Sequence, residues 1–205
     1  MYLLTETASP FALERWAAFF ANFGQFAKGF FYTLGISIGA LIVALLLGLI
    51  FGAMSSTHNK VLRGISRVYV EIFQNTPLLV QFVVVFYGIS ILTDGHIMIP
   101  ISLTAILCVG VYTGAYISEI IRTGIEAVPK GQTEAALSQG FTYADTMRII
   151  ILPQAVRTIL PPLTNQVVNL IKNTSTVAII SGADIMFTAK AWAYDTTNYV
   201  PAFAG

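Results

Sequence analysis

Charged side chains are scarce in this sequence. Only 10% of its 205 residues are Asp, Glu, Lys or Arg, whereas soluble domains carry about 25%. The hydrophobic share is 56% and the formal net charge is +1. A chain of this composition cannot cover a water-facing surface, and its balanced charge gives no field that would attract nucleic acid. The composition therefore indicates several segments that lie within a lipid bilayer.

Cysteine and the common catalytic motifs are also rare or missing. The one cysteine, Cys108, lies in an apolar run, which favours a packing role over a redox role. The sequence has no phosphate-binding loop, no H-E-x-x-H motif, no paired His and Cys ligands and no serine nucleophile elbow. The N-terminus also lacks the pattern of a cleavable signal. We predict that the chain is not an enzyme and holds no metal or cofactor of its own.

Four segments predict membrane-spanning helices, each of which needs about 20 mostly apolar residues. Two runs, 29–59 and 72–93, contain no acidic or basic side chain other than histidine. The predicted helices cover about 29–54, 65–92, 99–121 and 161–181. The fourth contains Lys172, and Pro161 and Pro162 suit its start because the first N–H groups of a helix need no partner within it. We therefore predict an all-α integral membrane protein.

Basic residues in the connections set the predicted orientation, since cytoplasmic loops carry an excess of Lys and Arg. The connection 55–67 and the segment 122–157 are rich in these residues, while 93–100 has neither. The first and third connections are therefore predicted to be cytoplasmic and the second to be outside. This arrangement places the N-terminus outside the cell.

The two ends of the chain are both assigned to the outer face. Residues 1–28 are predicted to form an outer segment in which 11–26 is an amphipathic helix lying in the membrane interface. Residues 182–205 turn polar and aromatic, which predicts an outer loop or surface helix. The stretch between them, 29–181, is the predicted transmembrane domain.

Small residues in the first predicted span suggest close helix packing. Gly35 and Gly39 form one pair at a spacing of four, and Gly48 and Gly52 form another. Small residues at this spacing let neighbouring helices approach closely. At about 100° per residue the two pairs lie on nearly opposite faces, so this helix is predicted to pack on two sides.

Polar side chains within the predicted spans fall on single helical faces. In the third and fourth spans they recur every three or four residues, and in the second Gln74 and Gln81 flank Pro77. Polar groups in hydrocarbon are costly unless they face a cavity or each other. These stripes predict a shared water-accessible path. The predicted path residues are Gln74, Asn75, Thr76, Gln81, Tyr112, Tyr116, Glu119, Asn165, Asn169, Lys172 and Thr176.

Individual path residues have a structural interpretation as well. Lys172 could meet a substrate carboxylate, or it could pair with helix carbonyls, pair with a carboxylate or reach the headgroups. Glu119 lies beside Arg122, which favours a structural ion pair. The stretch 75–77 could expose backbone to the path or be a proline kink whose carbonyls are satisfied by neighbours. The residues leave these alternatives open.

The cytoplasmic segment 129–153 has ordered local signals. Pro129 ends the preceding helix, and the run that follows it favours a short helix up to Gly140, a residue typical of a left-handed helix end. Thr142 and Asp145 form the capping pattern of a second helix, predicted to run to Leu152. We predict two short helices joined by a sharp elbow. The elbow could lie on the surface alone or enter a groove on a partner.

The spacing in this segment resembles the EAA loop of ABC importer permeases. Glu134-Ala135-Ala136 is followed by three residues and Gly140, then by nine residues and Ile150-x-Leu152-Pro153. In that family the loop is a coupling helix that docks into an ATPase subunit, where ATP and Mg²⁺ bind. The resemblance implies that the coupling residues here are Glu134, Ala135, Ala136, Gly140, Leu152 and Pro153.

A second resemblance narrows the substrate. Residues 73–81, FQNTPLLVQ, and 170–175, LIKNTS, are similar to segments of the polar amino acid uptake permeases. Together the resemblance covers about residues 25–185. Members of that family usually carry a further, fifth span after the outer loop, and Gly205 stands where that helix would begin.

The resemblance implies a permease subunit in a bacterial cytoplasmic membrane. Its expected partners are two ATPase subunits, a second permease subunit that is a copy or a homologue, and an extracytoplasmic amino-acid-binding protein. An ion-coupled secondary transporter is the main alternative, but such carriers usually show inverted repeats, which four spans do not provide. A membrane enzyme would need a constellation of catalytic residues that is missing here. The sequence does not specify which amino acid is carried.

Overall fold

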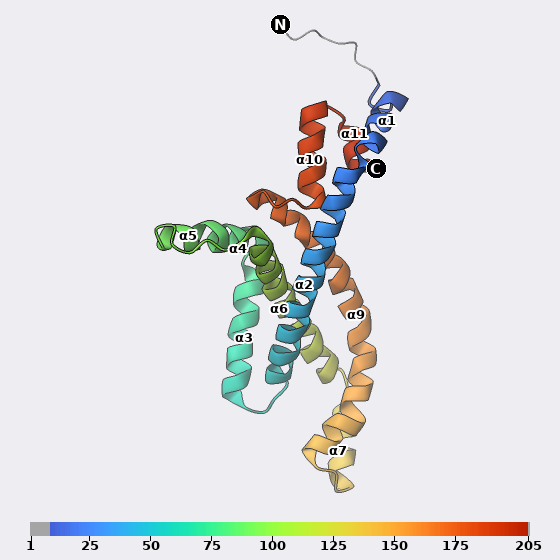
Figure 1. Ribbon diagram of the computed structural model, residues 1–205. Helices are drawn as coiled ribbons and strands as arrows, with labels where there is room; N and C mark the ends of the chain where they lie inside the picture. The colour runs from blue at the N-terminus through green and yellow to red at the C-terminus, as the bar shows by residue number, and fades with distance from the viewer. Residues whose placement is uncertain (1–8, 205) are drawn as a thin grey trace.

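The computed structural model describes residues 9–204, and every regular element in that range is a helix (Figure 1). Long helices run side by side along one axis, with short helices at both ends. The elements are α1 (Leu13–Ala21), α2 (Phe23–Ser55), α3 (Lys60–Asn75), α4 (Leu78–Val83), the π-helical turn η1 (Val84–Gly88), α5 (Ile89–Leu92), α6 (Ile101–Glu126), α7 (Lys130–Ser138), α8 (Tyr143–Asp145), the π-helical segment η2 (Thr146–Ile151), α9 (Leu152–Asn173), the 3-10 segment η3 (Thr174–Ile180), α10 (Ile185–Thr196) and α11 (Tyr199–Ala204). The predicted all-α class is confirmed.

The core lies along the contact between α2 and α6. Small residues bring these helices together, since Ala40 and Ala44 are fully buried against α6. A Cβ atom at Gly48 would lie 2.4 Å from the Cγ2 atom of Ile117. In a membrane, where apolar surface gains little from leaving lipid, such close backbone approach is a main source of helix association.

The two glycine pairs of α2 do not pack on opposite sides as predicted. Gly39, Gly48 and Gly52 all face isoleucine side chains of α6, whereas an added Cβ at Gly35 would meet nothing within 4 Å. The branched side chain of Ile106 reaches Gly39, so α6 covers a wider sector of α2 than an ideal helical wheel suggests. Gly39, Gly48 and Gly52 therefore serve one extended interface with α6.

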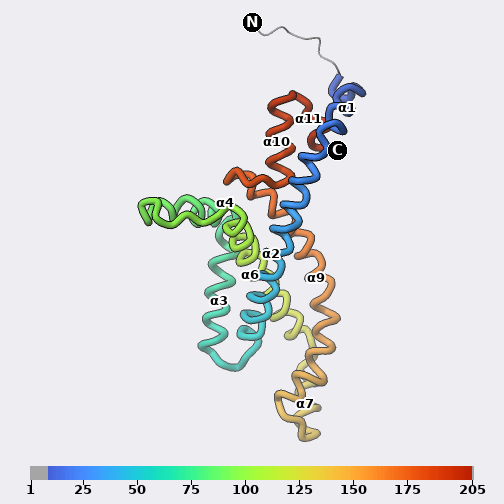
Figure 2. The backbone as a smooth tube through the Cα atoms, in the orientation of Figure 1, coloured from blue at the N-terminus to red at the C-terminus, as the bar shows by residue number. Residues whose placement is uncertain are grey.

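The second predicted span is not one continuous helix. Helix α3 ends at Asn75, and the arm formed by α4, η1 and α5 leaves it at an angle of 97° (Figure 2). Pro77 lies at the bend and cannot donate a hydrogen bond to the preceding turn, which favours the break. The single helix predicted over 65–92 is therefore wrong.

The structure supports two or three spans by length and composition. Helices α2 and α6 qualify, and the bent pair formed by Lys60–Asn75 and Leu78–Leu92 adds a third if it counts as one span. The predicted total of four is not confirmed among residues 9–204. Helix α9 falls short because its sequence includes many polar side chains, among them Arg157 and Lys172.

The start of the fourth predicted helix is also wrong. Pro161 and Pro162 lie inside α9, which begins at Leu152 and continues directly from α8 and η2. The second helix of the elbow consequently does not stop before Pro153 as predicted. Each proline removes only one N–H donor, and packing of α9 against α6 holds the helix through both sites.

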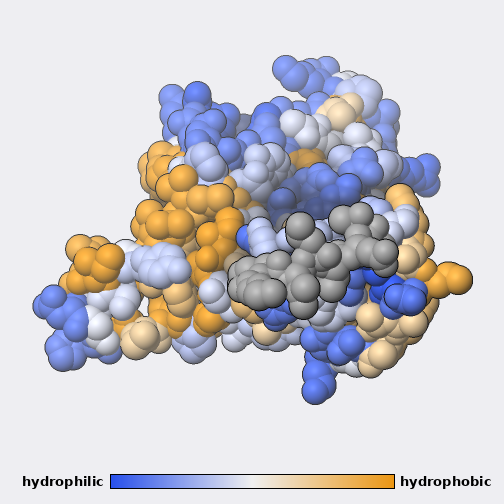
Figure 3. All heavy atoms as spheres, turned by 90° about the horizontal axis from the view of Figure 1, so that it is seen from above, coloured by the Kyte–Doolittle hydropathy of each residue, from blue (hydrophilic) through white to orange (hydrophobic). Residues whose placement is uncertain are grey.

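Different helices form the two ends of the molecule. Helix α7 and the turn between α2 and α3 lie at one end, while α1, α10 and α11 lie at the other (Figure 1). The side of the molecule that carries the α4–α5 arm is largely apolar when viewed from the α10 end (Figure 3). The two loops predicted to be cytoplasmic thus share one end of the fold.

Residues 182–204 form helices rather than an open loop. Helix α10 packs on α2, where a Cβ at Gly29 would lie 2.9 Å from the Thr188 hydroxyl. Phe19, Phe26 and Trp192 form an aromatic cluster, with ring centroids 5.5 Å apart for Phe26 and Trp192. Helix α1 is shorter than the predicted 11–26, and α2 begins at Phe23 instead of near 29. The interfacial position of α1 stays a prediction.

Candidate functional site

The elbow of the segment 129–153 has the predicted geometry. Gly140 has a φ of +87° and ends α7 in the left-handed conformation. The N–H of Phe141 donates to the carbonyl of Ala136 and the N–H of Gly140 to that of Leu137, which is the double hydrogen bond of a glycine-terminated helix. The N–H of Asp145 then donates to the Thr142 hydroxyl and caps the next helix. The backbone is therefore fixed on both sides of the turn.

The predicted coupling residues differ in accessibility. Glu134, Ala135 and Gly140 are exposed, and so are Leu152 and Pro153 on the following helix. Ala136 is buried, because this side of α7 packs against η2. Only one of the two alanines is thus available to a partner, while the other fixes α7 to the rest of the chain.

A polar pocket of about 290 Å³ lies between α6 and α9. It brings together four predicted path residues, Tyr112, Tyr116, Asn169 and Lys172. The hydroxyl oxygens of the two tyrosines lie 3.1 Å apart and share a hydrogen bond. Among residues 9–204, no carboxylate lines the pocket, and the Lys172 ammonium is the one charged group in its lining.

Two residues of this pocket were missed by the sequence interpretation. Gln166 and Asn173 line it together with Lys172. They lie three residues before and four residues after Asn169, so the same helical spacing could have identified them. The predicted residues Asn165 and Thr176 do not line the pocket.

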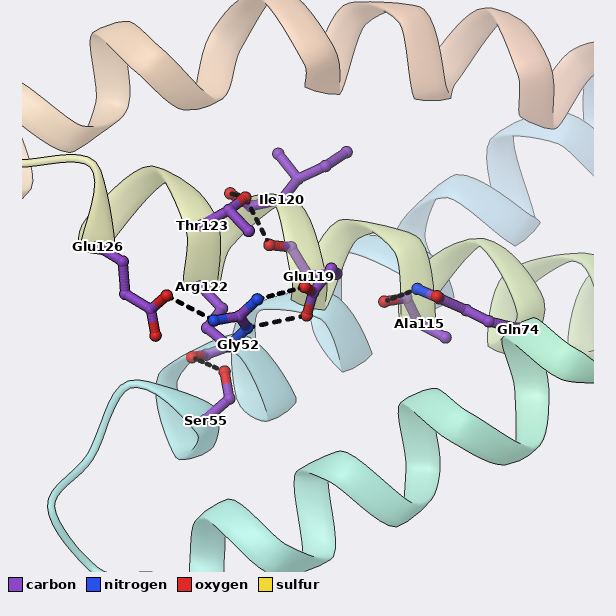
Figure 4. Close-up of polar contacts among 9 residues, drawn as sticks. All are labelled: Gly52, Ser55, Gln74, Ala115, Glu119, Ile120, Arg122, Thr123 and Glu126. Atoms are coloured by element: carbon purple, nitrogen blue, oxygen red, sulfur yellow. Dashed lines mark hydrogen bonds and ion pairs between the residues drawn. The ribbon is translucent and has the colours of Figure 1, made fainter.

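Gln74 and Glu119 lie elsewhere, in a groove of about 520 Å³ between α3 and α6. The Gln74 amide donates to the carbonyl of Ala115 at 3.2 Å and ties the two helices together (Figure 4). Glu119 accepts from Arg122, which also binds Glu126 at 2.5 Å. The ion pair that the sequence favoured for Glu119 is therefore present.

The backbone carbonyls around the break after α3 accept hydrogen bonds from side chains of the same segment. The Gln81 amide donates to the carbonyls of Phe73 and Thr76 at 3.1 and 3.0 Å, and Gln81 is only 8% exposed. The Asn75 amide donates to the carbonyl of Glu71 at 2.8 Å. Of the two alternatives for 75–77, the kink with occupied carbonyls matches this geometry.

Among residues 9–204, no group of three or more His, Cys, Asp or Glu side chains is placed to hold a metal ion. The chemistry available in the α6–α9 pocket is instead hydrogen bonding by hydroxyl and amide groups, with one ammonium. Such groups can hold a polar solute by hydrogen bonds and one ionic contact.

Comparison with known proteins places these features in context. Residues 44–205 match the family described as binding-protein-dependent transport system inner membrane component. The chain is 41% identical over 173 residues to the probable glutamine ABC transporter permease protein GlnM of Bacillus subtilis strain 168, covering 83% of this chain and 77% of that protein. It is 35% identical over 187 residues to the glutamate/aspartate import permease protein GltJ of Escherichia coli strain K12, covering 82% and 76%.

A solved structure agrees with these relatives. The structure described as an amino acid ABC transporter with histidines has a TM-score of 0.84 to this chain at 32% identity, over 92% of this chain and 87% of that one. The family match includes the α7 elbow and both sides of the α6–α9 pocket. The resemblance drawn from residues 134–153 is thus confirmed, and the chain belongs to the family of binding-protein-dependent transport system inner membrane components, the permease subunits of ABC transporters.

Proposed function

We propose that this chain forms the membrane path of an importer that carries polar amino acids into the cytoplasm. Its family consists of permease subunits of the inner membrane, which act with ATPase and binding-protein partners. Two relatives are named for glutamine and for glutamate or aspartate. The observation that carries the proposal is the capped elbow at Gly140, which presents Glu134 and Ala135 at one end of the molecule.

The elbow can transmit motion because of how it is joined to the rest of the chain. Ala136 packs against η2, and η2 continues without a break into α9 (Figure 2). Helix α9 carries Lys172 and Asn169 into the polar pocket. An ATPase subunit docked on α7 would therefore move the α9 wall of the pocket, with ATP and Mg²⁺ bound in that subunit and none in this chain.

The α6–α9 pocket is the proposed site of substrate contact. Lys172 would meet the carboxylate of an amino acid, while the Tyr112 and Tyr116 hydroxyls and the amide of Asn169 would bind its remaining polar groups. Asn165 and Thr176 would extend the path beyond the pocket along the polar side of α9. Gln74, Asn75, Thr76, Gln81 and Glu119 lie outside this pocket, and they would contribute to the path only through contacts with the second permease subunit.

The assembly that we propose has two permease subunits, two ATPase subunits on the α7 end and a binding protein on the α10 end. The second permease, a copy or a homologue, would cover the polar side of α9, which allows α9 to serve as a further span although it is not apolar enough alone. The basic start of α3, the turn before it and the α7 elbow would lie in the cytoplasm, with the N-terminus outside.

The test is ATP hydrolysis by the reconstituted complex. We would co-express the chain with its ATPase, place the complex in liposomes and add the binding protein loaded with one amino acid at a time. We expect a loaded form to stimulate hydrolysis and to name the substrate. Absence of any ATPase in the purified complex, with uptake driven by an ion gradient, would instead show a secondary transporter.

Lys172→Met tests the pocket itself. We expect uptake of an amino acid through this variant to show a KM raised at least tenfold, because the substrate carboxylate loses its ionic partner, with expression unchanged. The control is Lys190→Met on α10, an exposed lysine outside the pocket. Reduced expression of Lys172→Met with an unaltered KM would show that Lys172 has a structural role.

A further inference from the structure

The groove between α3 and α6 has at its mouth, near the start of α3, two cations with no ionic partner among residues 9–204. Arg67 binds Glu71 at 2.7 Å, and Arg122 binds both Glu119 and Glu126. All three carboxylates that line the groove are therefore engaged. Two further lining cations, Lys60 and Arg63, make no ion pair with any residue that the structure describes. The positive surplus thus lies at the start of α3.

Helix α3 presents three different faces. Ser66 and Tyr69 are buried against the rest of the fold. Lys60, Arg63 and Arg67 recur at intervals of three and four residues and line the groove. The third face is apolar and exposed, and its residues are Val61, Ile65, Val68 and Ile72. A row of cations therefore runs directly beside a row of exposed apolar side chains.

This combination suits the boundary between hydrocarbon and headgroups. Water solvates the cations but not the apolar row, whereas acyl chains solvate the apolar row but not the cations. The start of α3 lies at the same end as α7, the end that we assign to the cytoplasm. Anionic phospholipids give this leaflet its negative surface, and basic pockets between membrane helices bind their headgroups.

We propose that the mouth of the α3 groove binds an anionic phospholipid of the cytoplasmic leaflet. Lys60 and Arg63 donate to its phosphate oxygens, and its acyl chains lie along the apolar face of α3. A soluble phosphate would bind the cations and leave the apolar row uncovered. A phospholipid would bind the cations with its headgroup and cover the apolar row with its acyl chains. The lipid site is separate from the α6–α9 pocket. Of the proposed function, this proposal uses only the orientation, which places the start of α3 in the cytoplasmic leaflet.

The experiment measures lipid binding by the purified full-length chain in neutral detergent. Mixed micelles of phosphatidylglycerol or phosphatidylcholine are titrated in, and the melting temperature and the number of retained lipids are recorded. We expect phosphatidylglycerol to stabilise the protein with saturation and phosphatidylcholine to do so weakly. The double variant Lys60→Gln with Arg63→Gln should bind phosphatidylglycerol at least tenfold more weakly.

Control variants test whether the binding depends on Lys60 and Arg63 or on charge in general. Lys190→Gln on α10 and Arg148→Gln on η2 each remove an exposed cation outside the groove and should change the affinity less than twofold. Lys60→Arg with Arg63→Lys should retain binding, since both charges remain. An equal loss of binding in the two controls would overturn the proposal, because the attraction would then be a general effect of charge.

Two other outcomes would also overturn it. If inorganic phosphate abolishes the stabilisation by phosphatidylglycerol, and the double variant Val61→Ser with Ile65→Ser leaves that stabilisation unchanged, the mouth is a site for a soluble anion. If the double variant Lys60→Gln with Arg63→Gln keeps its affinity for phosphatidylglycerol but no longer copurifies with a co-expressed ATPase subunit, the cations are a protein-docking surface. None of these measurements uses transport or ATP hydrolysis, so failure here and failure of the proposed function are distinguishable.

Discussion

At the scale of single residues, Gly140 is constrained by its backbone and not by space. Its φ of +87° lies in the left-handed region, and an added Cβ would meet nothing within 4 Å. A β-branched residue in this conformation costs about 1–2 kcal/mol or more. Any effect of substitution must therefore arise from the changed course of the chain at the elbow.

We expect Gly140→Val to displace α7 and to uncouple ATP hydrolysis from uptake by at least tenfold. The measurement is the ratio of amino acid imported to ATP hydrolysed in liposomes. Gly131→Val is the control, because Gly131 also has open space around it but an ordinary φ within α7. Full uptake by Gly140→Val would remove the elbow from the coupling mechanism.

Asp184 is a residue at which pH should control stability. Its side chain is fully buried, and its oxygens accept from the N–H groups of Met186 and Phe187 at the start of α10. Burial raises the pKa of this carboxyl above its ordinary value of 3.8, and the backbone hydrogen bonds oppose the shift. The folded state therefore holds the proton more tightly than the unfolded chain does.

The sign of the pH effect follows from this difference. The stabilisation by the Asp184 proton is complete below about pH 3.8 and is lost as the pH rises through the raised pKa. Asp184→Asn keeps a cap acceptor but cannot titrate. We expect its melting temperature, followed by the fluorescence of the two tryptophans, to vary less between pH 4 and 7 than that of the wild type. Asp195→Asn, at an exposed site, should behave as wild type, and a large loss of stability at pH 7 in Asp184→Asn would contradict the assignment.

At the scale of elements, the α2–α6 contact depends on which glycines face the partner helix. Gly48 is covered by Ile117, with room for no side chain, whereas Gly35 faces open space. Both lie in the interior of the same helix. Alanine at either site adds one methyl group and raises helix propensity by about 1 kcal/mol in water, so only the packing differs.

We expect Gly48→Ala to lower the melting temperature in detergent and Gly35→Ala to leave it unchanged or raise it. The added methyl group at position 48 must push Ile117 or the whole of α6 away. The pair is its own control, because the two substitutions are chemically identical. Equal melting temperatures for both variants would show that α2 and α6 do not pack closely in detergent.

At the scale of the whole molecule, the orientation can be tested by labelling. Cys108 is buried and can be replaced by serine to leave no native thiol. New cysteines at the exposed sites Asp195 and Gln139 then mark the two ends of the fold. We expect a membrane-impermeant maleimide to label Asp195→Cys in intact spheroplasts and Gln139→Cys only after permeabilisation. The reverse pattern would invert the proposed topology.

The scarcity of charge and the local signals of this sequence were sufficient for several conclusions. Composition indicated a helical membrane protein, because 10% charged residues cannot solvate a protein surface. Gly140, with Thr142 and Asp145, specified the elbow, since left-handed turns and caps depend on a few neighbouring residues. The spacing around Glu134 identified the family. Each of these properties depends on residues that are neighbours in the sequence, so the sequence alone determines it.

Other features depended on contacts between segments that are distant in the chain. Tertiary packing decided that Gln81 closes the break at Pro77, that α9 runs through Pro161 and Pro162, and that Gln74 binds α6 instead of lining the α9 pocket. A polar residue on one helix can face a cavity, a neighbouring carbonyl or lipid with the same sequence spacing. Periodicity therefore assigned such residues to a face, and only the neighbouring helices determined what that face meets.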